Sequence, residues 1–87
     1  MKTIFKYQLK NMNEQLFWLH AGAKLLHSDI QHGEMTLWFL VDSDQPMVRA
    51  QVNLYATGEK IPDGHGEHVG TFVLHGGALV LHAFMYA

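Results

Sequence analysis

The residues best suited to chemistry lie in one stretch, Val52 to Thr71, where a strand-like segment enters a glycine-rich polar loop and another leaves it. The loop runs from Ala56 to His68, and its three glycines and Pro62 exclude a helix. The run from Pro62 to Gly64 is typical of a turn, because proline presets φ and glycine accepts a positive φ further on. Loops of this length in small domains are often functional sites, although a solvated connector is the simpler interpretation.

Binding of a nucleotide-like anion is the first chemistry that this stretch suggests. Backbone N–H groups of Gly58, Gly64 and Gly66 can form an anion-binding nest that needs no net positive charge. Arg49 and Lys60 are candidates for phosphate pairing, and the guanidinium can pair in a bidentate manner. The loop is not a nucleotide-binding phosphate loop, because it lacks the Gly-Lys-Ser/Thr ending and a following helix.

Aromatic and amide side chains complete this hypothesis. A base would stack on an aromatic ring, and Trp18, Trp38 and Tyr55 are the candidates. The amides of Gln51 and Asn53 suit ribose or base edges, although the polar row to which they belong also fits an ordinary solvated strand face. The predicted ligand-binding residues are Arg49, Gln51, Asn53, Tyr55, Thr57, Gly58, Lys60, His65, His68 and Trp38.

Metal binding and catalysis have weaker support in the sequence. His65 and His68, with Glu67 and Asp63 nearby, are zinc-ligand types. His75 and His82 flank a Gly-Gly pair across which they can approach one another. Histidine spacing on a loop is a weak signal, so we predict no metal and no cofactor. Cysteine is absent and no Ser-His-acid order stands out, so we expect a protein without catalytic activity.

Composition sets limits on size, partners and location. A chain of 87 residues is predicted to form a single β domain spanning 1–87, and 48% hydrophobic residues exceed what so small a volume can bury, which indicates a homo-oligomer. The net charge of −2 argues against duplex nucleic acid as a partner. No apolar run approaches the roughly 18 residues of a membrane span, and no signal-peptide pattern is present. Lack of cysteine is compatible with the cytosol.

Alternating hydrophobicity predicts seven short strands, at residues 3–9, 16–19, 24–31, 35–42, 48–56, 69–75 and 79–86. A helix from Asn13 to Leu26 is the competing interpretation of the second segment. Glycine-containing turns favour hairpins, with Gly33 supplying positive φ and Gly76-Gly77 forming a two-residue turn. In the third segment, Leu26 and Ile30 are predicted to share a face. We therefore predict an all-β fold, a small antiparallel β-sandwich or barrel.

Several motifs along the chain form a recognisable pattern. They are the opening Met1 to Tyr7, the segments Ala21–Leu26 and Leu37-Trp38, the loop residues Tyr55–Gly58 with Ile61–Asp63, and the stretch Gly76–His82. Together they resemble an uncharacterised family of small phage-encoded proteins. The resemblance covers nearly the whole chain and supplies no catalytic residues. It implies an accessory gene of a phage or prophage, a setting in which small proteins often counter host defence.

The resulting hypothesis is a non-catalytic phage anti-defence protein in the host cytoplasm that sequesters a small nucleotide-type immune signal. The site would lie between the 56–68 loop and a neighbouring chain. The alternative is a protein inhibitor that binds a host defence protein through an aromatic surface, because aromatic residues dominate interface hot spots. Trp38, Leu40, Phe84 and Tyr86 are the candidates for that surface.

Overall fold

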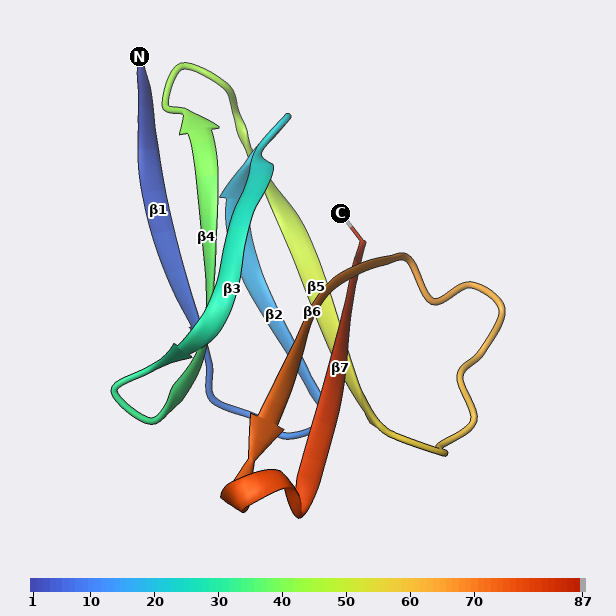
Figure 1. Ribbon diagram of the computed structural model, residues 1–87. Coiled ribbons are helices and arrows are strands. Elements are labelled where there is room, and N and C mark those ends of the chain that lie inside the picture. Colours follow the sequence, from blue (N-terminus) through green and yellow to red (C-terminus); the bar gives the residue numbers. More distant parts are fainter. Residues whose placement is uncertain (87) are drawn as a thin grey trace.

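The computed structural model describes residues 1–86 as a sandwich of two antiparallel sheets (Figure 1). One sheet has three strands in the order β1-β4-β3, and the other has four in the order β2-β5-β7-β6. The strands are β1 (Lys2–Leu9), β2 (Glu14–His20), β3 (Lys24–Gln31), β4 (Glu34–Asp42), β5 (Met47–Ala56), β6 (Glu67–Leu74) and β7 (Leu79–Tyr86). The predicted all-β sandwich is therefore confirmed.

The core lies between the sheets and follows from the period-2 pattern of the strands. In β5, Ala50, Val52 and Leu54 point inward and are at most 4% exposed, while the residues between them form the outer row. The central strand β4 contributes Leu37 and Phe39, both fully buried. Because each inner row meets the inner row of the opposite sheet, the alternation in the sequence translates directly into the core.

The segment with a competing helix interpretation is strand β2, paired with β5. Its inward side chain Phe17 stacks on Tyr7 with ring centroids 4.6 Å apart, and both rings pack near Phe39. The Tyr7 hydroxyl donates a hydrogen bond to the Trp18 carbonyl oxygen over 2.7 Å, and burial raises the pKa of this phenol. The segment forms a strand because alternation places Phe17 and Leu19 against the core while Leu16 and Trp18 stay exposed.

Two local predictions are wrong. In β3 the register shifts between Leu25 and His27, so Leu25 packs against the core and Leu26 is 46% exposed rather than sharing a face with Ile30. Such a bulge adds one residue to the strand and reverses which side chains face inward. The connection after β6 is a 3₁₀ turn, η1 (His75–Gly77), followed by Ala78, and not a two-residue Gly-Gly turn.

The β3–β4 hairpin matches its sequence signature. Gln31 pairs with Glu34, so His32 and Gly33 form a two-residue loop with φ values of 52° and 78°. Positive φ at both positions is the mark of a type I′ turn, whose twist matches that of the flanking strands.

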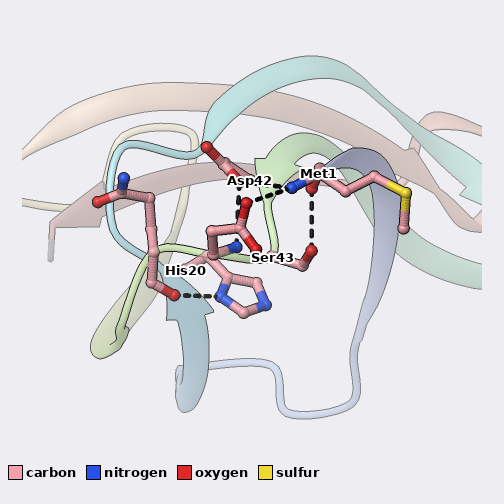
Figure 2. Close-up of polar contacts among 6 residues, drawn as sticks. Met1, His20, Asp42 and Ser43 are labelled. Carbon is pink, nitrogen blue, oxygen red and sulfur yellow. Dashed lines mark hydrogen bonds and ion pairs between the residues drawn. The ribbon is translucent and has the colours of Figure 1, made fainter.

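One end of the sandwich is held by polar contacts around the first residue (Figure 2). The Met1 ammonium group donates to the carboxylates of Asp42, over 3.1 Å, and Asp44, over 2.7 Å, while the Ser43 hydroxyl donates to the Met1 carbonyl oxygen. His20 Nδ1 lies 2.7 Å from the Gln45 carbonyl oxygen, so Nδ1 carries the proton. These contacts tie the start of β1 and the end of β2 to the β4–β5 turn.

None of the helical segments among residues 1–86 has the length and apolar character that a membrane crossing requires.

Candidate functional site

The outer face of the four-stranded sheet carries most of the chemistry-bearing side chains. The strand registers place Asn53 beside Phe84, Tyr55 beside His82, and His82 beside Thr71. These residues come from β5, β7 and β6, and their inward neighbours Leu54, Leu81 and Ala83 are core residues. The rigid core thus fixes a polar and aromatic surface across three strands.

The loop between β5 and β6, residues 57–66, is called the crossing loop because it passes over β7 on its way from β5 to the sheet edge. Figure 1 shows it, yellow to orange, bowing out beside β7. It returns to the sheet with His65 against Phe84, ring centroids 4.9 Å apart. His65 Nδ1 donates to the Gly66 carbonyl oxygen over 2.6 Å.

A pocket of about 280 Å³ lies between the crossing loop and β7, and is called the loop pocket. Phe84 and Ile61 give it apolar surface, and Thr57, Glu59 and His82 give it polar groups. Its remaining lining residues are Ala56 and Gly58. A mainly apolar hollow with a few convergent polar groups is the usual form of a small-molecule site, here at the small end of the size range.

Hydrogen bonds connect the loop pocket with the edge strand β6. Thr57 Oγ1 lies 2.8 Å from His82 Nε2, His82 Nδ1 lies 3.1 Å from Thr71 Oγ1, and Thr71 Oγ1 lies 3.0 Å from His68 Nε2. We call these four residues the hydroxyl–imidazole chain. Each hydroxyl and each neutral imidazole can donate once and accept, so all three bonds form with the protons running in either direction. The proton direction at Thr57 is therefore coupled to that at His68.

The Thr57–His82 pair has the geometry of a hydroxyl activated by a base, but its surroundings favour binding over turnover. In hydrolases the base is oriented by a carboxylate, which also stabilises the imidazolium that forms during the reaction. Here the second ring nitrogen of His82 faces the neutral hydroxyl of Thr71. A hydroxyl orients the ring but supplies no negative charge, so this chain arranges hydrogen-bond donors and acceptors rather than a strong base.

A second polar network lies next to the loop pocket on the same face. The Gln51 amide donates to the Glu14 carboxylate over 3.0 Å and to Asn53 Oδ1 over 2.9 Å. The Asn53 amide in turn lies 3.5 Å from the hydroxyls of Tyr55 and Tyr86. A broad open hollow of about 720 Å³ runs from Asn53 and Tyr55 to the β1–β2 turn. This network gives the face further amide and phenol groups beyond the loop pocket.

The start of the crossing loop is fixed by its own hydrogen bonds. The Ala56 N–H donates to the Glu59 carboxylate, and the Glu59 N–H donates back to the Ala56 carbonyl oxygen, both over 3.0 Å. The Thr57 N–H donates to the Val80 carbonyl oxygen. The amides on both sides of Gly58 are thus already bonded, and a carboxylate stands beside them. This arrangement does not support an anion-binding nest at Gly58.

The structure brings together some of the predicted site residues. Thr57 and Gly58 line the loop pocket, and His65 and His68 lie against Phe84 with ring centroids 4.9 and 5.3 Å away. The adjoining network includes Gln51, Asn53 and Tyr55.

Three predicted residues belong neither to the lining of the loop pocket nor to the adjoining network. Arg49 pairs with Trp18 and lies six residues before Tyr55 along β5, a separation of ~20 Å at strand spacing. Trp38 is on β4, in the opposite sheet, where its ring packs against His27. Lys60 is exposed in the crossing loop. Within one chain these residues do not assemble a phosphate clamp.

Sequence reasoning did not assign His82, Phe84, Thr71, Ile61 or Glu59 to the ligand site. The alternation of β7 was the available signal, because it puts His82 and Phe84 on one face of that strand. That this face is shared with Tyr55 depends on the pairing of β7 with β5, which the sequence did not show. The prediction that His75 and His82 can approach one another is wrong, because His82 pairs with Thr71 while His75 lies in the η1 turn. Among residues 1–86 no cluster of three or more His, Asp or Glu side chains is arranged to hold a metal ion.

The fold and the loop pocket define a small β-sandwich with a loop-covered hollow on one sheet. The chain belongs to the family described as a domain of unknown function (DUF7352), which matches residues 1–87. The same comparisons gave no match to a curated protein or to a solved structure.

Proposed function

We propose that this protein is a non-catalytic binding protein that captures a small nucleotide-type ligand in the loop pocket. The observation that carries the proposal is the hollow between the crossing loop and β7, with an aromatic ring, an imidazole, a hydroxyl and a carboxylate in one lining. In the phage setting implied by the sequence resemblance, such capture would remove an immune signal from the host cytoplasm.

The chemistry of the lining supports an aromatic ligand. Phe84 offers a π surface on which a base can stack, a contact typically worth about 1–3 kcal/mol. His65 already packs edge-to-face on that ring, with an interplanar angle of 63°, and so limits the space at one side of it. Thr57 and Glu59 provide polar atoms at the same hollow, which suits the hydrogen-bonding edge of a base.

The size of the pocket supports a two-part site. About 280 Å³ accommodates a ring system rather than a complete dinucleotide, so the sugar and phosphate would extend outside it. Arg49 is too far away within the same chain, but it neighbours the exposed Trp18 and Leu16, 59% and 51% accessible, on a sheet edge. Association in which this edge of one copy meets the loop pocket of another copy would supply the missing guanidinium.

Titration calorimetry against cyclic dinucleotides and ADP-ribose derivatives tests the proposal. We expect saturable binding of at least one nucleotide, and loss of that binding in Phe84→Ala protein that retains its far-ultraviolet circular dichroism. Absence of heat with every compound, for protein shown to be folded, would refute it. Native mass spectrometry of the purified protein reports the number of chains and any retained nucleotide together.

The second candidate function is inhibition of a host defence protein, and one observation favours it. Leu16 and Trp18 project from the edge strand β2 beside Arg49, and exposed Trp and Arg residues are typical interface anchors. Affinity capture from host lysate distinguishes the candidates. A stoichiometric protein partner that is lost in Trp18→Ala supports inhibition, whereas a retained nucleotide with ultraviolet absorbance supports nucleotide capture.

A further inference from the structure

We infer that the loop pocket selects a base with a lactam edge, a ring carbonyl next to a ring N–H as in guanine, over the amino-substituted edge of adenine. This inference rests on the proposed function and specifies its ligand class. It follows from the positions of Glu59 and Thr57, which are two residues apart in the crossing loop and line the same pocket.

The Glu59 carboxylate provides the acceptor side of this recognition. One oxygen, Oε1, accepts the Ala56 N–H over 3.0 Å, which fixes the orientation of the side chain. An ionised carboxylate has acceptor capacity on both oxygens, so the group retains acceptor sites while it is held in place. It favours ligand N–H donors and repels a ring nitrogen that presents a lone pair.

Thr57 provides the donor side, and the hydroxyl–imidazole chain can hold it in that role. If His82 donates from Nε2 to Thr57 Oγ1, the Thr57 hydroxyl proton is directed to the ligand. His82 Nδ1 then accepts from the Thr71 hydroxyl, whose oxygen accepts from His68 Nε2. In this arrangement every hydrogen bond of the chain has one donor and one acceptor, and the three distances are within hydrogen-bonding range.

The two bases present opposite patterns to this pair of groups. Guanine carries a carbonyl oxygen beside a ring N–H and an amino group, matching a hydroxyl donor beside a carboxylate acceptor. Adenine, turned over in the pocket, can accept from Thr57 at its ring nitrogen and donate to Glu59 from its amino group. It then offers the carboxylate one N–H donor, where guanine offers its ring N–H and its amino group side by side. Because Thr57 and Glu59 are exposed, the preference is assigned to the second charge-assisted hydrogen bond that guanine makes to the carboxylate, and not to the cost of leaving a buried polar group unpaired.

The apolar surface of the pocket fits a planar ring but does not discriminate between guanine and adenine. Phe84 stacks equally well on either base, and Ile61 and Ala56 contact both as apolar surface. Selectivity is therefore assigned to Glu59 and Thr57, with His82 as a positioning residue that acts through Thr57.

The test is calorimetric titration with GMP, AMP, cyclic di-GMP and cyclic di-AMP. We expect each guanine compound to bind at least about tenfold more tightly than its adenine counterpart, the usual effect of one discriminating hydrogen-bonded pair. Glu59→Gln can keep the bond to the Ala56 N–H through its amide oxygen while losing the charge, and should abolish the preference. Asp63→Asn, which removes the same charge elsewhere in the crossing loop, is the matched control and should retain it.

A second measurement addresses the hydroxyl–imidazole chain directly. Nitrogen-15 spectra of the histidine rings, recorded for the GMP complex, should show the His82 proton on Nε2. Thr71→Val should remove this preference for one His82 tautomer. A proton on Nδ1 in the complex would contradict the assigned direction.

The outcomes separate the inference from the proposed function. Equal binding of guanine and adenine compounds, or an unchanged preference in Glu59→Gln, overturns the selectivity while leaving nucleotide capture standing. If none of the four compounds nor any other nucleotide in the panel binds, both fail.

Discussion

Gly66 is the residue at which the crossing loop rejoins the sheet, and its missing side chain is a structural requirement. Its φ is 82°, and a Cβ there would lie 2.5 Å from the Met85 carbonyl oxygen and 2.9 Å from the Tyr86 ring. Both the left-handed backbone and the contact with β7 exclude a side chain. Because His65 is the preceding residue, the position of its ring on Phe84 depends on this close approach.

We therefore predict that Gly66→Ala destabilises the fold by about 1–3 kcal/mol, the usual range for strained backbone combined with overpacking. Urea denaturation measures the change. Gly64→Ala is the matched control, because Gly64 lies in the same loop, has no positive φ and has no atom within 4 Å of an added Cβ. Equal effects of the two substitutions would contradict the role given to Gly66.

Asp42 joins the β4–β5 turn to the start of β1. Its carboxylate accepts the Asp44 N–H and the Met1 ammonium group, and these contacts, in that order, hold the pKa of Asp42 below its usual value. A carboxyl group with a lowered folded-state pKa stabilises the fold above its ordinary pKa near 3.8. This contribution is lost as the pH falls through the folded-state value.

Substituting Asp42→Asn should lower the melting temperature slightly at neutral pH, and the difference from wild type should shrink as the pH falls and the Asp42 carboxylate takes up its proton. The effect is small because the carboxylate is solvent-exposed and screened. Melting curves across pH 2–7 for wild type and variant provide the measurement, and a constant difference over the whole range would contradict the prediction. At high pH, loss of the Met1 charge should also weaken this contact, because Asp44 and Asp42 raise the pKa of the amine.

At the scale of elements, the most extensive contact between strands of the two sheets is that of β3 with β6. Gly70 follows the irregularity in β6, where the register with β7 shifts between His68 and Gly70. A Cβ on Gly70 would lie 2.6 Å from Ser28 Oγ and 2.8 Å from Ser28 Cβ on β3. The small residue thus lets one sheet edge close onto the other.

Gly70→Ala should cost about 1–3 kcal/mol through overpacking, read from chemical denaturation. Removing the opposing side chain tests the cause: the double variant Gly70→Ala with Ser28→Gly should be less destabilised than the sum of the two single variants. Strict additivity would show that the contact with Ser28 is not the source of the cost.

The register shift in β6 also determines which of its side chains reach the candidate site. It places His68 and Thr71 on the outer face, where both reach the hydroxyl–imidazole chain, while Val69 and Phe72 enter the core. Bulges of this kind re-aim side chains near functional sites. The β6 edge therefore serves both the closure of the sandwich and the geometry of the site.

On the scale of the whole molecule, a single core supports both sheets. Phe39 is fully buried and lies close to the rings of Tyr7 and Phe17, which come from different sheets. Because the buried hydrophobic residues within 1–86 form one cluster, loss of this ring should loosen the entire sandwich, including the face that carries the loop pocket.

Phe39→Ala should lower the free energy of unfolding by about 3–5 kcal/mol, a large part of the total for a domain of this size. Val73→Ala is the control, since Val73 is 60% exposed and should change stability by less than about 0.5 kcal/mol. Loss of signal at the same denaturant concentration by tryptophan fluorescence and by circular dichroism would confirm that the sheets unfold together.

The sequence by itself determined the strands and most of the core. Period-2 alternation is local, so Val48 to Ala56 could be recognised as a strand with one inward row, and His32-Gly33 as a tight turn, without knowledge of any partner. Alternation fails where the chain departs from regular geometry, which is why the bulge at Leu26 and the η1 turn were mispredicted. Those irregularities are settled by pairing with β4 and β7, and no short window of sequence contains that information.

The crossing loop was recognised from its composition, but its neighbours were not. Strand order placed β7 between β5 and β6, and so brought His82 and Phe84 beneath the loop and left Trp38 on the other sheet. Residue types report what a side chain can do, whereas which side chains meet is decided by long-range pairing between segments tens of residues apart. The sequence thus determined which groups were available for binding, and only the tertiary structure decided which of them share a pocket.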